Sequence, residues 1–301
     1  MEAGCMDVAT IFHMIFLAFV TGFIYSLLAI GINFVLNVVK IINWAMGEFY
    51  LIGGYVQYYL IVLFLGPSLW WVAIIISMGS VALLGALYQK FLLKPMYSES
   101  GEKKEEFATI ITIITSVLII NLLAWLLGPT YHAPPSYWGV VTFFGMSIDG
   151  NKIIALFSTI LIIAVFLIAT KYTWTGKGLR ACAQNRVAAE SIGMDLRKYD
   201  MIAFAIGVAF AAAAGALLAA VFPLTAQSGK ISTMKGFQII VIGGVGSIMG
   251  GLVGGVLLAM IEAIASVLFV SSYRDIYGFI FMILILLVKP TGLFGEEQRE
   301  A

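Results

Sequence analysis

The stretch IFHMIFLAFVTGFIYSLLAIGINFVLNV occupies residues 11–38 and contains no Lys, Arg, Asp or Glu. A helix needs about 20 consecutive apolar residues to cross a bilayer. This run is longer than that, so it predicts a membrane-spanning helix. It is also too long for the apolar core of a cleavable signal peptide, and residues 1–10 lack Lys and Arg. We therefore expect residues 11–38 to remain in the protein as its first span.

The rest of the chain follows the same pattern. Of the 301 residues, 61% are hydrophobic and 11% are charged, against about 45–50% and about 25% in soluble domains. The mean hydropathy is +1.03. A net charge of +1 argues against a nucleic-acid partner, because no basic stripe could neutralise phosphates. These values predict an all-α polytopic membrane protein, with one transmembrane domain over residues 1–301 and further apolar runs at 44–65, 69–93, 108–127, 153–172, 201–221, 237–269 and 276–288.

The run 237–269 is too long for one straight span, since a helix rises 1.5 Å per residue. It also holds a dense set of glycines, namely Gly243, Gly244, Gly246, Gly250, Gly251, Gly254 and Gly255. We interpret the run as two passes, a short one that ends near Gly246 and a full helix from about Gly250. The chain is then expected to have about eight full transmembrane helices and a short pass broken by glycine.

The distribution of Lys and Arg orients this bundle. Residues 94–107 and 173–200 are rich in Lys and Arg, whereas residues 128–150 contain neither. Basic loops favour the cytoplasm. With the first two segments inside, 13 basic residues fall in the cytoplasm and four fall outside, namely Lys152, Lys230, Lys235 and Arg274. The N-terminus is then expected outside and the C-terminus in the cytoplasm.

The glycine cluster has two interpretations. Gly246 and Gly250 are four residues apart, as are Gly250 and Gly254, and this small-xxx-small spacing lets membrane helices approach closely. Packing alone would explain such a pattern. Alternatively, a broken helix at membrane depth is tolerated where it lines a cavity, and such half-helix ends bind solutes in several transporters.

Two carboxylates fall within apolar runs, Glu48 and Glu262. A charged side chain in the membrane is costly and usually faces the bundle interior or water. Glu48 lies near the start of its run and could be interfacial. Glu262 could equally hydrogen-bond a neighbouring helix. Each is also a candidate for a role in transport.

Residues 173–200 are polar but have a helical pattern. Alanines alternate here with charged and amide side chains, and Gly193 is a plausible helix stop. A short amphipathic helix of this kind can dock into a groove on a partner protein. A helix lying on anionic lipid would need bulky apolar anchors, which are scarce in this segment. We therefore predict a cytoplasmic docking segment over residues 173–200.

Motifs for catalysis or cofactor binding are not apparent. The chain contains no P-loop, so any ATP-driven function must use an ATPase on another chain. His13 and His132 do not form a metal-ligand set with cysteines or carboxylates. Cys5 and Cys182 lie far apart in sequence and predict neither a disulfide framework nor a metal pair. We expect no bound cofactor or metal and no enzymatic activity.

Four ordered blocks resemble one known family. They are YSLLAIGINFVLNVVKIINWAMGEFYLIGGY (25–55), GLRACAQNRVAAESIGMD (178–195), IVIGGVGSIMGGLVGGVLLAMIEA (240–263) and VKPTGLFG (288–295). Through them the chain resembles the inner-membrane permease subunits of branched-chain amino acid ABC importers. The resemblance implies a second related permease, two cytoplasmic ATPases and an extracytoplasmic substrate-binding protein as partners.

The resemblance also implies the location of two sites. The segment 178–195 matches the part that such permeases present to the ATPase, and its expected coupling residues are Gly178, Arg180, Ala181, Asn185, Ala189 and Gly193. The expected substrate pathway comprises Asn43, Gly47, Glu48, Gly243, Gly244, Gly246, Ser247 and Glu262. The chain departs from the family at Met46, where a histidine is common.

Two other functions remain open at the level of sequence. Close relatives of such permeases move urea or short amides, so the solute could differ from a branched-chain amino acid. A transporter coupled to an ion gradient could use Glu48 and Glu262 as coupling carboxylates. An intramembrane enzyme would need a paired nucleophile and base or a metal site, which the sequence does not offer.

Overall fold

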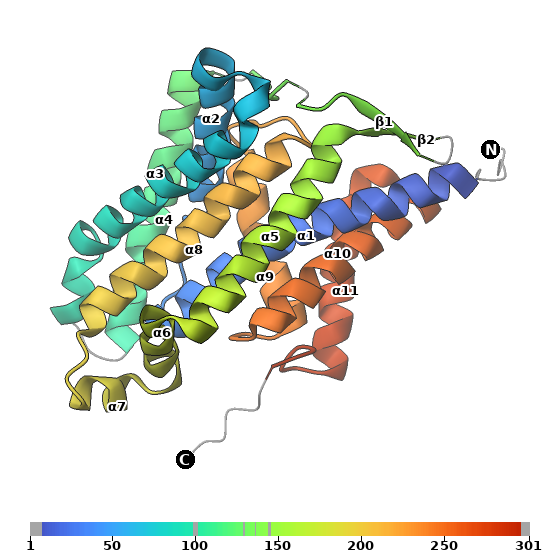
Figure 1. The fold of residues 1–301 in the computed structure, drawn as a ribbon. Helices are drawn as coiled ribbons and strands as arrows, with labels where there is room; N and C mark the ends of the chain where they lie inside the picture. Colours follow the sequence, from blue (N-terminus) through green and yellow to red (C-terminus); the bar gives the residue numbers. More distant parts are fainter. Residues whose placement is uncertain (1–7, 99–101, 129, 136, 144–145, 296–301) are drawn as a thin grey trace.

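The computed structural model describes residues 8–98, 102–128, 130–135, 137–143 and 146–295. The predicted N-terminal and C-terminal positions relative to the membrane concern residues 1–7 and 296–301, which lie outside this description. The described part folds into helices α1 (Val8–Val39), α2 (Met46–Leu60), α3 (Trp70–Phe91), α4 (Glu102–Leu127), α5 (Gly150–Tyr172), α6 (Trp174–Gln184), α7 (Arg186–Ser191), α8 (Leu196–Ala219), α9 (Ser228–Gly243), α10 (Ile248–Leu268) and α11 (Arg274–Val288), with a hairpin of β1 (Val140–Phe143) and β2 (Met146–Asp149) (Figure 1).

The predicted fold class is confirmed. Within the described residues, eight helical stretches are long and apolar enough to cross a membrane: 11–39, 46–65, 67–91, 103–127, 150–172, 196–219, 248–268 and 271–288. The chain is therefore a multi-pass membrane protein. Helix α9 has only 16 residues and is the additional short element. The break predicted within the run 237–269 is present, because α9 ends at Gly243 and α10 begins at Ile248.

Helix α8 forms the centre of the bundle. It packs against α1, α2 and α3, while α1 runs along α10 (Figure 1). The consecutive alanines 211–214 are buried, and their small side chains let neighbouring helices approach. A Cβ at Gly215 would overlap the main-chain carbonyl of Tyr50. The close contact between α2 and α8 therefore depends on glycine at this position.

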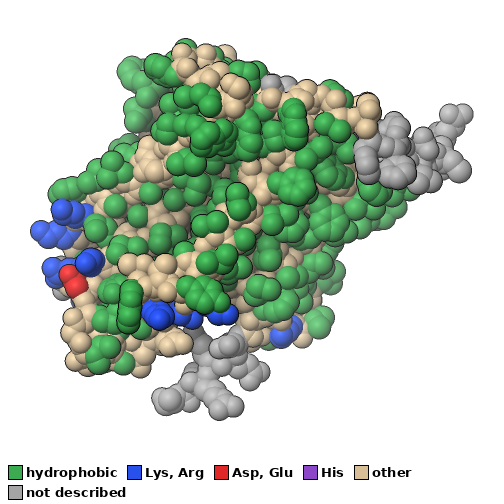
Figure 2. All heavy atoms as spheres, viewed as in Figure 1, with side chains coloured by type: hydrophobic (Ala, Val, Ile, Leu, Met, Phe, Trp, Pro, Cys, Tyr) green, Lys and Arg blue, Asp and Glu red, His purple; other side chains and the backbone are tan. Residues whose placement is uncertain are grey.

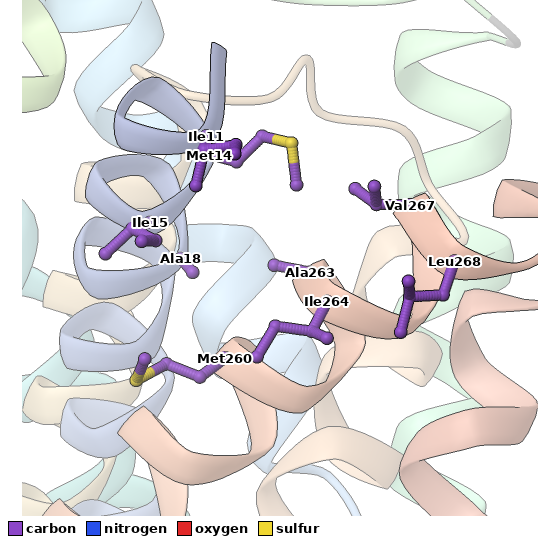
Figure 3. A pocket seen from close by; sticks show the side chains of 9 residues that line it. All are labelled: Ile11, Met14, Ile15, Ala18, Met260, Ala263, Ile264, Val267 and Leu268. Carbon is purple, nitrogen blue, oxygen red and sulfur yellow. The ribbon is translucent and has the colours of Figure 1, made fainter. Parts of the chain in front are cut away.

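The outer helices expose apolar side chains. Only 6% of the membrane-spanning stretch is buried within the protein in α4 and likewise in α11, whereas 78% is buried in α8. Hydrophobic side chains cover most of the face in Figure 2, and the Lys and Arg side chains gather near one end of the molecule. Such a surface suits contact with lipid or with another apolar subunit.

Several helix starts and one loop differ from the sequence prediction. Helix α4 begins at Glu102 instead of residue 108, because the Glu and Lys residues before the apolar run are good helix formers. Helix α9 begins at Ser228 instead of residue 237, so Lys230 and Lys235 lie inside a helix. The segment 128–150, predicted as a loop, contains the β1–β2 hairpin, in which Val140 lies opposite Asp149.

Candidate functional site

The break between α9 and α10 is a tight connection that requires glycine. Gly244 has a φ of 105° and Gly246 a φ of 86°, a region that residues with a side chain rarely adopt. Ser247 follows as the N-cap of α10, and its hydroxyl accepts a hydrogen bond from the main-chain N–H of Gly250 at 3.0 Å. The sequence therefore ends one helix and starts the next within four residues.

Two asparagines of α1 hold this break. The side-chain oxygen of Asn33 accepts a hydrogen bond from Gly246 N at 2.7 Å, and its amide donates to the carbonyl of Ser247 at 2.8 Å. The amide of Asn37, one turn later, donates to the carbonyl of Gly246 at 3.1 Å. The two amides thus satisfy main-chain groups that the interrupted helix leaves unpaired.

The segment after α11 packs on the other side of the break. The main-chain N–H of Leu293 donates to Ile242 O at 2.9 Å, and that of Phe294 donates to Gly243 O at 2.8 Å. These bonds satisfy the last carbonyls of α9. The block 288–295, which carried part of the family resemblance, therefore packs against the α9–α10 break.

The glycines of the cluster have different surroundings. A Cβ on Gly243 would overlap the carbonyl of Gly250, and one on Gly254 would lie 2.8 Å from Ile239 O. A Cβ on Gly246 would meet nothing closer than Asn37 Oδ1, at 3.7 Å. The packing interpretation therefore applies to Gly243, Gly250 and Gly254, whereas backbone conformation explains Gly246.

Gly246 also borders a cavity of about 260 Å³. Asn37, Lys40 and Glu105 contribute polar side chains to its wall. The cavity lies beside the end of α1, near the start of the extended segment that leads to α2. The glycine break thus combines close helix packing with a polar space.

Two of the expected pathway residues, Gly47 and Glu48, lie near the start of α9, and Asn43 lies in the segment that leads to them. Residues 40–43 are not helical, and Ile41 and Asn43 are buried. Irregular backbone at membrane depth is tolerated only where protein or a cavity surrounds it. Asn43 Oδ1 accepts a hydrogen bond from Ala45 N at 2.9 Å, which closes the turn into α2.

Helix α2 begins against α9. Gly47 N donates to Thr233 Oγ1 at 2.9 Å, and the glycine lets α2 approach Gly229. Glu48 lies in the first turn of α2, where the helix dipole favours a negative charge. Its carboxyl is buried beside Ser116, and no described residue forms a hydrogen bond with its Oε2. Glu48 is therefore buried within the protein.

Glu262 belongs to a separate ionic cluster. Its Oε1 pairs with Nζ of Lys235, and its Oε2 lies 3.0 Å from Nε of Arg274. Lys235 also contacts Asp275, at 2.8 Å. We expected Lys235 outside the membrane-spanning runs, but it lies buried in the middle of α9. Its charge is tolerated there because two carboxylates surround it.

The expected coupling segment consists of two helices. Asn185 separates α6 from α7, and its side chain caps α7 by accepting a hydrogen bond from Ala188 N at 3.0 Å. Gly193 follows α7 with a φ of 85°, so the predicted helix stop is confirmed. Figure 1 shows α7 lying beyond the ends of the membrane helices.

The expected coupling residues divide between two faces. Ala189 is buried against the chain's own core, Gly178 lies against the ring of Tyr199, and Ala181 is partly buried. Arg180 is exposed, and its Nη2 donates to Lys171 O at 3.2 Å. The alanine face therefore packs internally, at least at Ala189. Exposed apolar side chains instead project from Val187 and Ile192, which are 75% and 77% exposed.

Arg186 ties α7 to the bundle. Its guanidinium forms two hydrogen bonds with the buried carboxylate of Asp200 in α8, at 2.8 and 2.7 Å, and also donates to Val38 O of α1. The hydroxyl of Tyr97 donates to the same carboxylate at 2.9 Å. Burial raises the pKa of the Tyr97 hydroxyl, and the Asp200 carboxylate raises it further, so the donor keeps its proton.

Comparison with known proteins identifies the fold's family. The profile of the family described as "Branched-chain amino acid transport system / permease component" matches residues 14–288. The chain belongs to this family. The resemblance seen in the four sequence blocks is therefore confirmed, and it extends over almost the whole permease.

Individual relatives align over most of this permease. The high-affinity branched-chain amino acid transport system permease protein LivH of Escherichia coli K12 is 30% identical over 288 residues, which cover 93% of this chain and 94% of LivH. The corresponding protein BraD of Pseudomonas aeruginosa is 28% identical over 292 residues, with the same coverage. LivM of Escherichia coli K12 is 25% identical over 319 residues, or 96% of this chain and 70% of LivM.

Several residues that shape this permease were not singled out by their sequence pattern. Asn33 and Asn37 lie inside the first apolar run, where two amides spaced by four residues signal a shared helix face. Arg186 and Asp200 are distant polar residues in the 173–200 segment. Only the fold brings them together, although a single acid next to a long apolar run is a detectable signal of a buried partner.

Proposed function

We propose that this permease is a subunit of an ATP-binding-cassette importer that moves branched-chain amino acids across the inner or plasma membrane. Separate ATPase subunits would supply the energy, and the permease would perform no chemistry. The names of the relatives LivH and BraD support the solute. LivH and LivM of Escherichia coli are both named as permeases of such a system, which supports a second permease as a partner.

The observation that carries the proposal is the construction of the α6–α7 segment. The side chains of Val187 and Ile192 are exposed. The neighbouring Arg186 binds the helix bundle, because its guanidinium donates hydrogen bonds to Val38 O of α1 and to Asp200 of α8. Movement of a partner bound to the exposed side chains would therefore be transmitted to α1 and α8. This is the arrangement that a mechanical link between a cytoplasmic ATPase and a membrane pathway requires.

The pathway in this proposal runs along α9. Gly47 and Glu48 lie near its first turns, Asn43 precedes them, and Gly243 ends the helix, with Gly244, Gly246 and Ser247 in the connection that follows. The polar cavity beside Gly246 and the unpaired carboxyl oxygen of Glu48 support polar surroundings at both ends. We propose that these residues border the route and that an external binding protein delivers the solute to it.

The ion-coupled alternative is weaker on one specific point. Glu262, one of its two coupling carboxylates, already has its charge balanced by Lys235 and Arg274 of the same chain. Met46, where a histidine is common in the family, is fully buried at the start of α2. A buried thioether makes packing contacts there.

Uptake measurements test the proposal. Cells lacking their own branched-chain amino acid importers would express this permease with a second permease, the two ATPases and the binding protein. Uptake of tritiated leucine that requires the permease and a hydrolysis-competent ATPase is the expected result. Uptake that persists with an inactive ATPase would support ion coupling, and uptake of labelled urea or acetamide in place of leucine would identify the other solute class.

A further inference from the structure

A small cavity opens between α9 and α11, with a volume of about 180 Å³. Its wall contains the charged side chains of Lys230, Lys235 and Asp275, together with the amide of Gln238. The remaining wall is apolar. None of these residues belongs to the pathway set expected from the sequence.

Charges in the wall are only partly balanced within the chain. Lys235 pairs with Glu262 and with Asp275, and Arg274 pairs with Glu262. Lys230, near the start of α9, is exposed and forms no ion pair with a described residue. The side chain of Asp275 is 62% exposed despite its contact with Lys235, so its carboxylate can accept further hydrogen bonds.

This face is unsuited to lipid. Asp275 belongs to the membrane-spanning stretch 271–288, and the cluster reaches Lys235 in the middle of α9. Charged side chains within the membrane face a bundle interior or a water-filled cavity. The α9–α11 face therefore borders water or another subunit in the assembled transporter, and a solute could reach it.

Apolar side chains lie beside the two charges. Ile231 and Met234 project from α9, and Phe279 projects from α11; all three are exposed on this face. Gln238 is buried, and its Oε1 has no hydrogen-bond partner among the described residues. The cavity thus combines an unpaired cation, an accessible carboxylate, an unused amide acceptor and an apolar wall.

We infer that this cavity is a transit site for a zwitterionic amino acid with an apolar side chain. Lys230 binds the α-carboxylate, Asp275 binds the α-ammonium group, and Ile231, Met234 and Phe279 contact the side chain. The inference rests on the proposed transport function and specifies where the solute is recognised. Neutral urea or a short amide would leave Lys230 without a partner of opposite sign and would bring no second cation to Asp275, so the site favours the amino acid.

Photocrosslinking with L-photo-leucine tests this placement in the complete transporter. Cells that express the permease with its partner subunits would be illuminated during uptake, and the labelled peptides of the permease would be identified by mass spectrometry. We expect label on residues 228–243 and 274–288, and we expect excess leucine to remove it. Label confined to other helices, or label that leucine does not displace, would overturn the inference.

Variants separate recognition from folding. Lys230→Gln removes this cation without breaking an ion pair between described residues, and we expect at least a roughly tenfold rise in the photo-leucine concentration needed for half-maximal labelling. Asp275→Asn should act similarly, whereas Asp275→Glu should retain labelling. Lys152→Gln, at the start of α5 and outside the cavity, is the matched control.

The outcomes also separate this inference from the proposed function. If wild-type cells show no leucine uptake that depends on the permease, the proposed function fails, and the transit site fails with it. If leucine uptake is present but Lys230→Gln and Asp275→Asn leave uptake and labelling at wild-type levels, only the transit site is refuted. The amount of assembled complex in each variant, measured by affinity purification, shows that a loss of labelling is not a loss of protein.

Discussion

At the scale of single residues, the glycines of the α9–α10 break have two distinct physical roles. Gly243 provides space, because its α-carbon faces the backbone of Gly250. Gly246 provides a backbone conformation, since its φ is 86° and the space around it is open. Substitutions at these neighbouring positions should therefore fail in different ways.

We predict that Gly246→Ala lowers leucine uptake while the complex still assembles. The left-handed conformation costs a residue with a Cβ about 1–2 kcal/mol, which is enough for roughly a tenfold effect on a conformational equilibrium. Gly246→Asn should be milder, because asparagine tolerates this conformation. Uptake of leucine and the yield of purified complex would be compared for each variant.

Gly243→Ala is the contrasting variant. Its methyl group would overlap main-chain atoms that cannot move independently, so we expect loss of folded permease together with uptake. Equal losses of complex and uptake in Gly246→Ala would instead show that this glycine also serves packing, and would remove it from the pathway.

At the scale of secondary-structure elements, α7 acts through its attachment to the bundle. Arg186 joins it to Asp200 with two hydrogen bonds, and the hydroxyl of Tyr97 donates a further hydrogen bond to the same buried carboxylate. A lysine would supply one point charge in place of the planar fork. The geometry of α7 relative to α1 and α8 therefore depends on arginine.

We predict that Arg186→Lys reduces solute-stimulated ATP hydrolysis more than it reduces assembly. Arg186→Gln would leave Asp200 buried without a cation, a change that typically costs about 3–5 kcal/mol, so the permease should be lost. Adding Asp200→Asn to Arg186→Gln should restore the amount of permease but not the coupling. Normal stimulation of ATP hydrolysis in that double variant would contradict the role of Arg186 as a link.

The exposed side chains of Val187 in α7 and of Ile192, its C-cap, predict a second effect. Val187→Glu and Ile192→Glu place charges where the free chain is open, so the permease should fold. An apolar contact with the ATPase would be lost, and we expect a several-fold decrease in ATPase co-purification, equivalent to about 1–3 kcal/mol for each buried aliphatic side chain. Lys152→Glu, at the end of α5 that is remote from α6 and α7, is the control. Unchanged co-purification in both α7 variants would exclude this face as the docking surface.

At the scale of the whole molecule, the number of membrane passes depends on whether the short helix α9 crosses the bilayer. Eight full spans alone would place residues 1–7 and 296–301 on the same side. We propose that α9 is a ninth pass, which puts the two ends of the chain on opposite sides. The positive-inside rule then predicts that the basic segment 173–200 lies in the cytoplasm and that the hairpin β1–β2 and the preceding loop lie outside.

Thiol labelling tests this arrangement in intact cells. With Cys5 replaced by serine, Tyr131→Cys should react with an impermeant maleimide added outside, whereas Val187→Cys should react only after the membrane is opened. Native Cys182 is buried, and burial raises the pKa of its thiol, so little reactive thiolate forms at neutral pH and background labelling stays low. Labelling of Val187→Cys from outside would show that the orientation is the reverse of the proposed one.

The sequence by itself determined the class of the molecule and its main divisions. Long apolar runs predict spanning helices because backbone groups in lipid must be satisfied within the helix, and the glycines of 243–246 predict a break because they release the chain from helical geometry. The stop at Gly193 has the same origin. These features depend on local chemistry, and all of them are present in the structure.

Only the tertiary structure decided which polar groups meet. Lys235 lies at a helix start in the sequence pattern, but α10 and α11 bring Glu262 and Asp275 to it. Asn33 is more than 200 residues from Gly246, whose main chain it holds. A charged or amide side chain in a membrane must find its partner somewhere in the fold, and the sequence reveals the need for that partner without revealing its location.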